Sequence, residues 1–269
     1  MSDQKESVQI QFGTQAENYA RSAVFASSAS LTEMVNLVRP QQTWEVLDVA
    51  TGGGHCAFAF APLVKHVIAT DITEPMLRAA ERVARERGLG NISFEQADAE
   101  SLNYPDGRFD LVTCRIAAHH FSDAGQAIRE MARVCKPGGL VAVIDGIAPS
   151  ERAAADEINA WEIARDPSHV ALLTINGWSS LFCAANLDHV HINKHLMELD
   201  FDDHMRRAGV NEQTAEQLRT RLLKGSPAMH DWLKPRQKDG RLIFDWPLIV
   251  MIGRKGTQIS DCRFPIVDG

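Results

Sequence analysis

Three neighbouring side chains carry the clearest chemistry in this chain. Arg115 ends the apolar run Phe109 to Arg115, and His119 and His120 follow it closely. Imidazole titrates near pH ~6.5, so a histidine can remove a proton from a nucleophile at neutral pH. A guanidinium can hold a carboxylate. The segment therefore predicts a site where His119 acts as a base, although two packed histidines without a catalytic role are the alternative.

Acidic residues stand at the ends of other apolar runs. Asp71 ends the run His66 to Asp71, and Asp98 follows the run Ile92 to Ala97. A carboxylate at such a position can accept hydrogen bonds from two neighbouring hydroxyl groups. Alternatively, an acid at the end of a strand caps a helix or forms a surface salt bridge.

Three glycines follow the apolar run Val46 to Val49, and they predict a tight turn that approaches a ligand. Gly52, Gly53 and Gly54 do not form G-x-G-x-x-G, and no Gly-Lys-Ser/Thr follows them. The spacing therefore does not favour pyrophosphate as the ligand.

The elements that must position these residues alternate between strands and helices. Strands are predicted at Trp44 to Val49, His66 to Asp71, Ile92 to Ala97, Phe109 to Arg115 and Leu140 to Asp145, and helices at Pro75 to Arg87 and Ala124 to Cys135. Gly88 and the pair Gly138-Gly139 are predicted to end these helices. Alternation of this kind is typical of an α/β doubly wound sheet, which binds ligands at the carboxyl ends of its strands.

Four segments in this order resemble the motifs of one enzyme family. They are Asp48 to Gly54 with small residues at Ala50, Gly52 and Gly54, then Ile68 to Ile72, Glu95 to Glu100, and Phe109 to Arg115. The chain resembles the class I S-adenosylmethionine-dependent methyltransferases, in particular their ubiquinone/menaquinone C-methyltransferase-like (type 11) branch. Ala50 stands where many members have glycine, and we expect its methyl group to be tolerated if the position keeps a negative φ.

The resemblance implies a cofactor, S-adenosyl-L-methionine, and roles for individual residues. Asp71 would accept from the ribose hydroxyls, Asp98 from the adenine amino group, and the Ala99 amide would donate to the ring. The implied cofactor contacts are Tyr19, Asp48, Ala50, Gly52, Gly54, Asp71, Ile72, Met76, Asp98, Ala99 and Arg115. The implied catalytic residues are His119 and Tyr19, and His120, His169 and Trp178 are implied substrate contacts.

The family fold implies a Rossmann-like seven-stranded sheet with additions at both ends. We expect an N-terminal helical arm in residues 1–40, with helices at Ser7 to Phe12, Gln15 to Arg21 and Ser30 to Val38. The cofactor-binding core takes residues 41–200. A helical lid over the active site takes residues 201–240, inserted before the last strand, and residues 241–269 hold that strand and a tail without a strong pattern.

Three histidines alternate along the predicted strand Val190 to Leu199. His189, His191 and His195 are therefore expected to share one face. A metal site is the alternative, but no carboxylate or cysteine completes the set at ligand spacing. No metal is predicted.

Composition limits the remaining possibilities. The 269 residues carry 28 basic and 35 acidic side chains, a net charge of −7, without a basic run, so a large nucleic-acid footprint is not expected. Five scattered cysteines, the lack of a signal-peptide pattern and the lack of a membrane-spanning run favour a cytoplasmic protein.

The function predicted is methylation of carbon or oxygen on a small molecule. Non-methylating chemistry on the same cofactor and a non-catalytic binding protein are the alternatives, and the acceptor and oligomeric state stay open.

Overall fold

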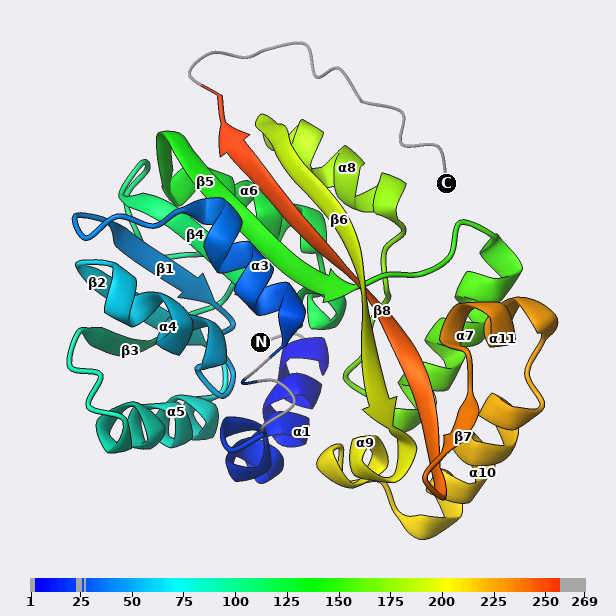
Figure 1. Cartoon of the computed structure of the whole chain (residues 1–269). Coiled ribbons are helices and arrows are strands. Elements are labelled where there is room, and N and C mark those ends of the chain that lie inside the picture. The colour runs from blue at the N-terminus through cyan, green and yellow to red at the C-terminus, as the bar shows by residue number, and fades with distance from the viewer. Residues whose placement is uncertain (1–2, 23–25, 27, 257–269) are drawn as a thin grey trace.

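The computed structural model describes residues 3–22, 26 and 28–256, and in this part of the chain eight strands form one twisted sheet (Figure 1). Its order is β3-β2-β1-β4-β5-β8-β6, with the short β7 paired to β8. The first five strands are parallel, and β8 runs antiparallel to β5 and β6. The strands are β1 (Glu45–Val49), β2 (His66–Asp71), β3 (Ile92–Gln96), β4 (Phe109–Arg115), β5 (Cys135–Gly146), β6 (Leu187–Asp200), β7 (Arg236–Lys238) and β8 (Arg241–Lys255). The doubly wound α/β prediction is confirmed, and β7 is added to the seven strands expected.

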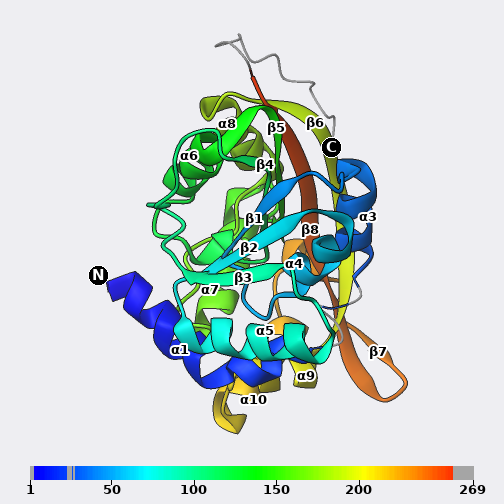
Figure 2. The ribbon, with the colours of Figure 1, turned by 90° about the vertical axis from the view of Figure 1, so that its left-hand side faces the viewer.

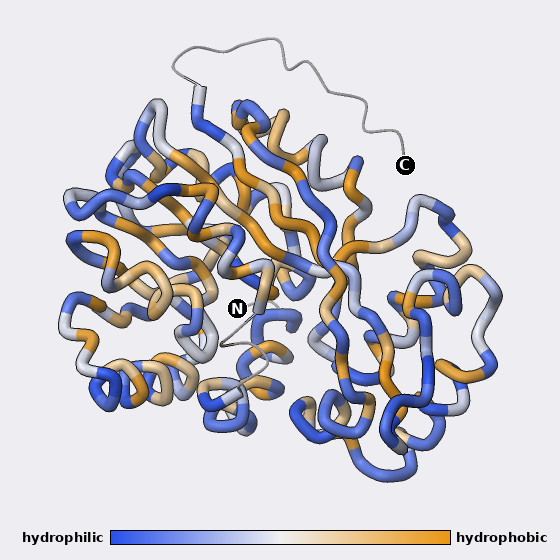
Figure 3. Tube along the Cα trace, viewed as in Figure 1, coloured by the Kyte–Doolittle hydropathy of each residue, from blue (hydrophilic) through white to orange (hydrophobic). Residues whose placement is uncertain are grey.

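Helices cover both faces of the sheet, as Figure 2 shows edge-on. They are α1 (Asp3–Ala20), α3 (Ala29–Val38), α4 (His55–Phe60), α5 (Glu74–Glu86), α6 (Ala124–Val134), α7 (Arg152–Arg165), α8 (Ile175–Ala184), α9 (Phe201–Arg207), α10 (Glu212–Leu223) and α11 (Pro227–Leu233), with 3₁₀ turns at Ala61–Leu63 and Ala118–His120. Met34 of α3 and Phe60 of α4 are buried on one face, and Met131 of α6 and Phe182 of α8 on the other. Hydrophobic residues follow the central strands between these layers (Figure 3).

The turn into β5 corrects the predicted helix stop. α6 ends at Val134, and Cys135 already belongs to the strand, so Gly138 and Gly139 end no helix. Gly138 has φ +77°, a conformation that glycine adopts without strain. A Cβ on Gly139 would lie 2.9 Å from the Asp110 carbonyl oxygen. These glycines therefore serve the close approach of β5 to its neighbour.

The N-terminal arm contains one continuous helix where two were expected. α1 runs through Gly13 without a break and packs along α5 (Figure 2). Ala16 and Ala20 are buried there against Met76 and Ala80. Burial of this face outweighs the ~1 kcal/mol that a glycine costs inside a helix.

The helical insertion before the last strand is confirmed, and its helices α10 and α11 pack on α7 (Figure 1). Leu218 and Leu222 of α10 belong to the same apolar cluster as Trp161 of α7. The Trp161 indole N–H donates to the Leu218 carbonyl at 3.0 Å. The insertion thus builds a second part of the core at the end of β6 and β8.

The prediction that His189, His191 and His195 share one face is wrong. His189 pairs with Gly253 and His191 with Ile252, so Val190 forms a bulge that shifts the alternation of side chains. His189 lies against Phe182 of α8. His191 and His195 instead both contact Glu33 of α3 on the opposite face. No group of three or more metal-ligating side chains occurs among the described residues.

None of the helices in the described ranges has the length and apolar character needed to cross a membrane.

Candidate functional site

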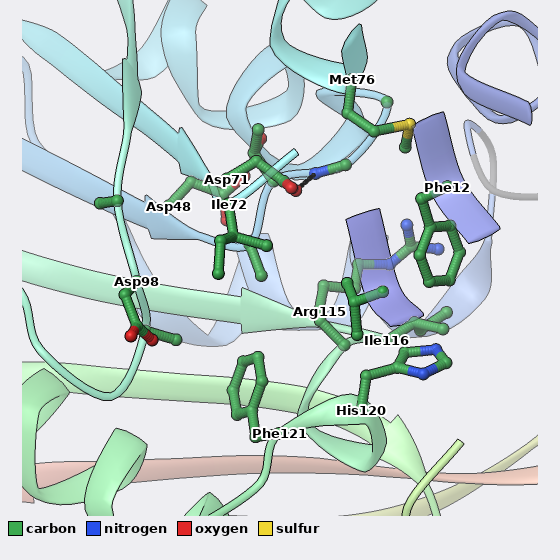
Figure 4. Close-up of a pocket in the computed structure, with 18 of the residues that line it drawn as sticks. Phe12, Asp48, Asp71, Ile72, Met76, Asp98, Arg115, Ile116, His120 and Phe121 are labelled. Atoms are coloured by element: carbon green, nitrogen blue, oxygen red, sulfur yellow. Dashed lines mark hydrogen bonds between the residues drawn. The ribbon is translucent and has the colours of Figure 1, made fainter. Parts of the chain in front are cut away.

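A cavity of about 1060 Å³, including its open mouth, lies at the carboxyl ends of β1, β2 and β4 (Figure 4). Parallel strands bring the ends of their polar motifs to this edge of the sheet. The lining contains many of the residues predicted from sequence, namely Tyr19, Asp48, Ala50, Gly52, Asp71, Ile72, Met76, Asp98, Ala99, Arg115 and His120. It also contains Phe12, Ile116 and Phe121, which form apolar walls between them.

The loop after β1 has a left-handed backbone at alternate positions. Gly52 has φ +54° and Gly54 has φ +84°. Ala50 has φ +51°, so the expectation that it keeps a negative φ is wrong. The left-handed region costs a residue with a Cβ roughly 1–2 kcal/mol, which places backbone strain at the cavity.

Two buried aspartates hold this loop in place. The Asp48 carboxylate accepts from the Thr51 and Thr113 hydroxyls, each at 2.6 Å. Asp71 accepts from the Gly52 N–H at 2.9 Å through Oδ2 and from the Thr73 N–H at 2.8 Å through Oδ1. Burial raises the pKa of both carboxyl groups. Asp71 retains lone pairs for further donors, as a carboxylate offers about four acceptor sites.

The third acidic position meets the N-terminal arm. Lys5 of α1 lies 2.5 Å from Asp98 and 2.9 Å from Glu100. These hydrogen bonds raise the pKa of Lys5 even though burial acts to lower it. The arm is thereby held over the part of the cavity that Asp98 and Ala99 line.

Further polar contacts make α1 the roof of the cavity. Gln9 donates to the Ile72 carbonyl at 2.9 Å, and Gln4 donates to the His120 carbonyl at 3.0 Å. At the other end of the helix, a Cβ on Gly53 would lie 2.9 Å from the Tyr19 carbonyl oxygen. A side chain on Gly53 would therefore displace the arm. Of the described residues that line the cavity, none comes from the insertion 201–238. The cavity is therefore covered by α1 and not by the inserted helices that were expected to form a lid.

The two adjacent histidines have different environments. His119 Nδ1 lies 2.6 Å from Asp145 Oδ1, and this carboxylate raises the pKa of His119 despite burial. His120 lines the cavity and its Nδ1 donates to the Ser168 carbonyl at 3.0 Å. Burial and the neighbouring His119 lower the pKa of His120 to about 3. His120 is therefore a neutral ring at the cavity wall, with His119 beside it and paired to Asp145.

Two more buried rings are kept neutral. His55 donates from Nε2 to the Tyr19 carbonyl at 2.9 Å, and burial lowers its pKa to about 4. His169 lies 2.9 Å from the Asn159 side-chain oxygen, and burial with the neighbouring His119 lowers its pKa to about 2. Such rings are neutral in the folded protein but titrate normally when it unfolds.

Arg115 lies in the wall between Asp48 and the arm. Its guanidinium donates to the Ser28 hydroxyl at 3.0 Å and lines the cavity. Burial lowers the pKa of Arg115. Figure 4 shows this side chain beside Phe12 and Ile116, on the opposite side of the cavity from Asp98.

Similarity to known proteins agrees with this arrangement. A family model described as a methyltransferase domain matches residues 46–139. An uncharacterized methyltransferase of Bacillus subtilis, YcgJ, is 37% identical over 220 residues, which cover 82% of this chain and 87% of that protein. This chain belongs to the class I S-adenosylmethionine-dependent methyltransferases. The crystal structure of YcgJ superimposes on this methyltransferase with a TM-score of 0.80, 34% identity, and coverage of 85% of this chain and 99% of that one.

Two further proteins extend the comparison. A putative methyltransferase from Bacillus halodurans has a TM-score of 0.80 at 33% identity, covering 86% of this chain and 100% of that one. The ubiquinone/menaquinone biosynthesis C-methyltransferase of Pseudomonas entomophila is 34% identical over 165 residues, which cover 58% of this chain and 64% of that enzyme. The methyltransferase thus resembles this C-methyltransferase over somewhat more than half of its length.

Some residues predicted for the methyltransferase site lie outside the cavity lining. Gly54 forms the turn into α4, and His119 and His169 lie behind His120. Trp178 is 1% exposed and belongs to the apolar core beneath α6 and α8. These four residues therefore support the wall of the cavity, whereas the other predicted residues line it.

Sequence reasoning missed several residues of the methyltransferase site. Lys5 and Phe12 reach the cavity from the arm, and Asp145 pairs with His119. His55 was missed as well, although it follows the third glycine directly. Asp145 ends the fifth predicted strand. These two positions in the sequence could have indicated that both residues belong to the site. The sequence gives no comparable signal for Lys5, because its partners are 93 and 95 residues away.

Proposed function

We propose that this methyltransferase uses S-adenosyl-L-methionine to methylate a carbon or oxygen atom of a small molecule. One observation carries the proposal: a single cavity joins the acidic residues at the ends of β2 and β3 to a wall of aromatic and imidazole side chains under α1. The first part suits a nucleoside and the second suits an acceptor.

The residues present fit the cofactor. Asp71 is 8% exposed, ends its strand at the cavity, and retains acceptor sites for ribose hydroxyls. Asp98 and Ala99 would meet the adenine, and Arg115 would hold the carboxylate of the methionine part. Ile72 and Met76 would pack against the nucleoside. When bound, the sulfonium supplies an electrophilic methyl group.

The chain's own residues would then bind and orient the acceptor. Phe12 stands edge-on to both Tyr19 and His120, with ring centroids 5.3 and 5.0 Å apart. These three rings favour a flat, small acceptor aligned with the methyl group, which is the main requirement of an in-line displacement. α1 supplies two of these rings and lies over this end of the cavity.

The two histidines have different roles in this proposal. His120 contacts the acceptor but is a weak base because its pKa is low. His119 is the stronger base because Asp145 stabilises its protonated form. His119 lies behind His120 rather than in the lining, so we keep it as the base only for an acceptor whose proton comes within its reach past His120, with Tyr19 orienting that acceptor. A carbon nucleophile that is already electron-rich would need only the positioning.

A small acceptor in the cytoplasm fits the rest of the molecule. The net charge of −7 disfavours a nucleic-acid partner. Within the described ranges Cys56, Cys114, Cys135 and Cys183 are free thiols, as a reducing compartment requires.

Methyl-labelled cofactor tests the proposal. S-adenosylhomocysteine should bind in a calorimeter, and incubation with panels of phenols, enols and amines should move the label into an acceptor. Turnover of the cofactor without transferred label would instead support non-methylating chemistry. Absence of S-adenosylhomocysteine binding by the folded protein would refute the assignment of the cavity.

A further inference from the structure

A buried ion cluster stands behind the cavity at the end of α7. Arg165 is 7% exposed, and its Nε donates to the Glu162 carboxylate at 2.8 Å. Its Nη2 lies 4.0 Å from Asp166 Oδ2. Glu162 and Asp166 are each 1% exposed. Buried ion pairs contribute little net stability because desolvation offsets their attraction, so this cluster calls for a reason other than stability.

The first link from the cluster leads to the arm. Arg165 lies beside Tyr19, close enough to act against the burial that raises the pKa of the tyrosine hydroxyl. Tyr19 belongs to α1 and lines the cavity, whereas Arg165 belongs to α7 and is absent from the lining. Because a tyrosine ring has only two side-chain torsions, fixing its hydroxyl fixes the face that it presents to the cavity.

The second link leads to the histidine at the cavity wall. Asp166 Oδ1 accepts from the Ser168 N–H at 2.9 Å and from the Ser168 hydroxyl at 2.6 Å. The Ser168 carbonyl in turn accepts from His120 Nδ1 at 3.0 Å. This bond determines the tautomer of His120 and directs its Nε2 lone pair away from the loop.

We propose that Arg165 is a positioning residue for methyl transfer. It lies against Tyr19 and is linked to His120 through Asp166 and Ser168, so that two side chains from distant elements keep one arrangement at the acceptor end of the cavity. The arginine contacts neither cofactor nor acceptor. This inference rests on the proposed function, because it assigns that end of the cavity to the acceptor.

The charge of Arg165 also acts on the surrounding histidines. It contributes to lowering the pKa of His120, His169 and His204, and it opposes the raised pKa of His119. The ionisable groups around it are Tyr19 on α1, His119 and His120 after β4, Asp145 on β5, Glu162, Asp166 and His169 on α7 and its following loop, and His204 and Arg207 on α9. Glu162 acts in the opposite sense on His119, raising its pKa by more than Arg165 lowers it. Removing both charges should therefore move the acid limb that His119 sets to lower pH.

Two variants separate positioning from folding. Arg165→Lys keeps the charge but loses the planar geometry that bonds two partners. The double variant Glu162→Gln/Arg165→Met removes both charges, so no lone ion stays buried. Arg133→Lys is the matched control because Arg133 makes the same i,i+3 pair, with Glu130, away from the cavity.

Fluorotyrosine NMR reads the arrangement without turnover. The chain has two tyrosines, Tyr19 and Tyr104, so it should give two ¹⁹F resonances. Both Arg165 variants should shift or broaden the Tyr19 resonance and leave Tyr104 unchanged. Arg133→Lys should do the reverse, because Arg133 donates to the Tyr104 carbonyl. A Tyr19 resonance unchanged in both folded Arg165 variants would overturn the proposal.

Binding and kinetics complete the test. S-adenosylhomocysteine affinity should stay within about twofold, because Asp71 and Asp98 lie outside the cluster. We expect kcat to fall about tenfold in Arg165→Lys and about a hundredfold in the double variant, whose acid limb moves to lower pH because Glu162 contributes more to the pKa of His119 than Arg165 does. Wild-type kcat and an unmoved limb in the double variant would show a merely structural cluster. A folded wild-type protein that transfers no label would refute the proposed function, while the NMR result would still judge the link to Tyr19.

Discussion

Changing Asp71 to alanine is the most direct perturbation of the cofactor site. The side chain accepts the Gly52 and Thr73 N–H groups and, as proposed, two ribose hydroxyls. Hydrogen bonds to a charged group contribute ~1.5–3 kcal/mol, so the loss for S-adenosylhomocysteine should be roughly ten- to a hundredfold in Kd. Calorimetry measures this directly.

The same change also has a structural effect that must be separated from binding. Two backbone N–H groups lose their acceptor, which costs about 1–3 kcal/mol each when they stay buried, offset in part because burial of the carboxylate is itself unfavourable. Thermal unfolding measures this loss. Binding must be recorded at a temperature where the variant is folded.

Asp123→Ala is the control for this effect. Asp123 accepts the Gln126 N–H at 2.8 Å as the N-cap of α6, and it is absent from the cavity lining. Its loss should lower the unfolding free energy by about 1 kcal/mol with no change in cofactor affinity. If folded Asp71→Ala binds S-adenosylhomocysteine as tightly as the wild type does, the ribose assignment fails.

Three further predictions concern strain, the arm and pH. Ala50→Gly should leave stability unchanged or raise it by up to ~1 kcal/mol in urea unfolding, because relief of the left-handed strain offsets the entropy of glycine; a clear loss would argue against strain. Lys5→Met should free α1 from Asp98. Dissociation of S-adenosylhomocysteine, measured by stopped flow, should become several-fold faster and less dependent on salt. An unchanged dissociation rate would contradict the idea that Lys5 holds the arm over the cavity. The pKa values of His55 and His169 are depressed in the folded state to about 4 and about 2, so below pH ~6.5 the unfolded chain binds more protons. Stability should therefore fall on acidification by up to ~1.4 kcal/mol per pH unit for each ring, and His169→Gln should flatten this slope in urea titrations; equal slopes would count against it.

The local pattern of the chain determined the half of the cavity that we assign to the cofactor. β2 and β4 have the bounds that their apolar runs predicted, and Asp71 lies where its run ends. This succeeds because a parallel strand buried on both faces must be apolar, and because its polar residues can then stand only at its ends. The carboxyl ends of parallel strands lie at the same edge of the sheet, independently of the conformation of the loops.

Local pattern failed where backbone geometry depends on distant contacts. Nothing in the residues around Val190 announces the bulge that separates His189 from His191 and His195, because it arises in the pairing of β6 with β8. The left-handed φ of Ala50 was likewise not visible, since alanine does not favour that conformation.

The side of the cavity that we assign to the acceptor was decided by tertiary structure alone. Arg165 acts on Tyr19 although the two are far apart in the sequence, and His119 contacts Asp145 on the neighbouring strand. Sequence spacing cannot predict such pairs, because they depend on how the arm, the sheet and α7 pack. The adjacent residues His119 and His120 show the consequence: identical side chains acquire opposite pKa shifts, since one faces a buried carboxylate and the other a carbonyl and a neighbouring imidazole.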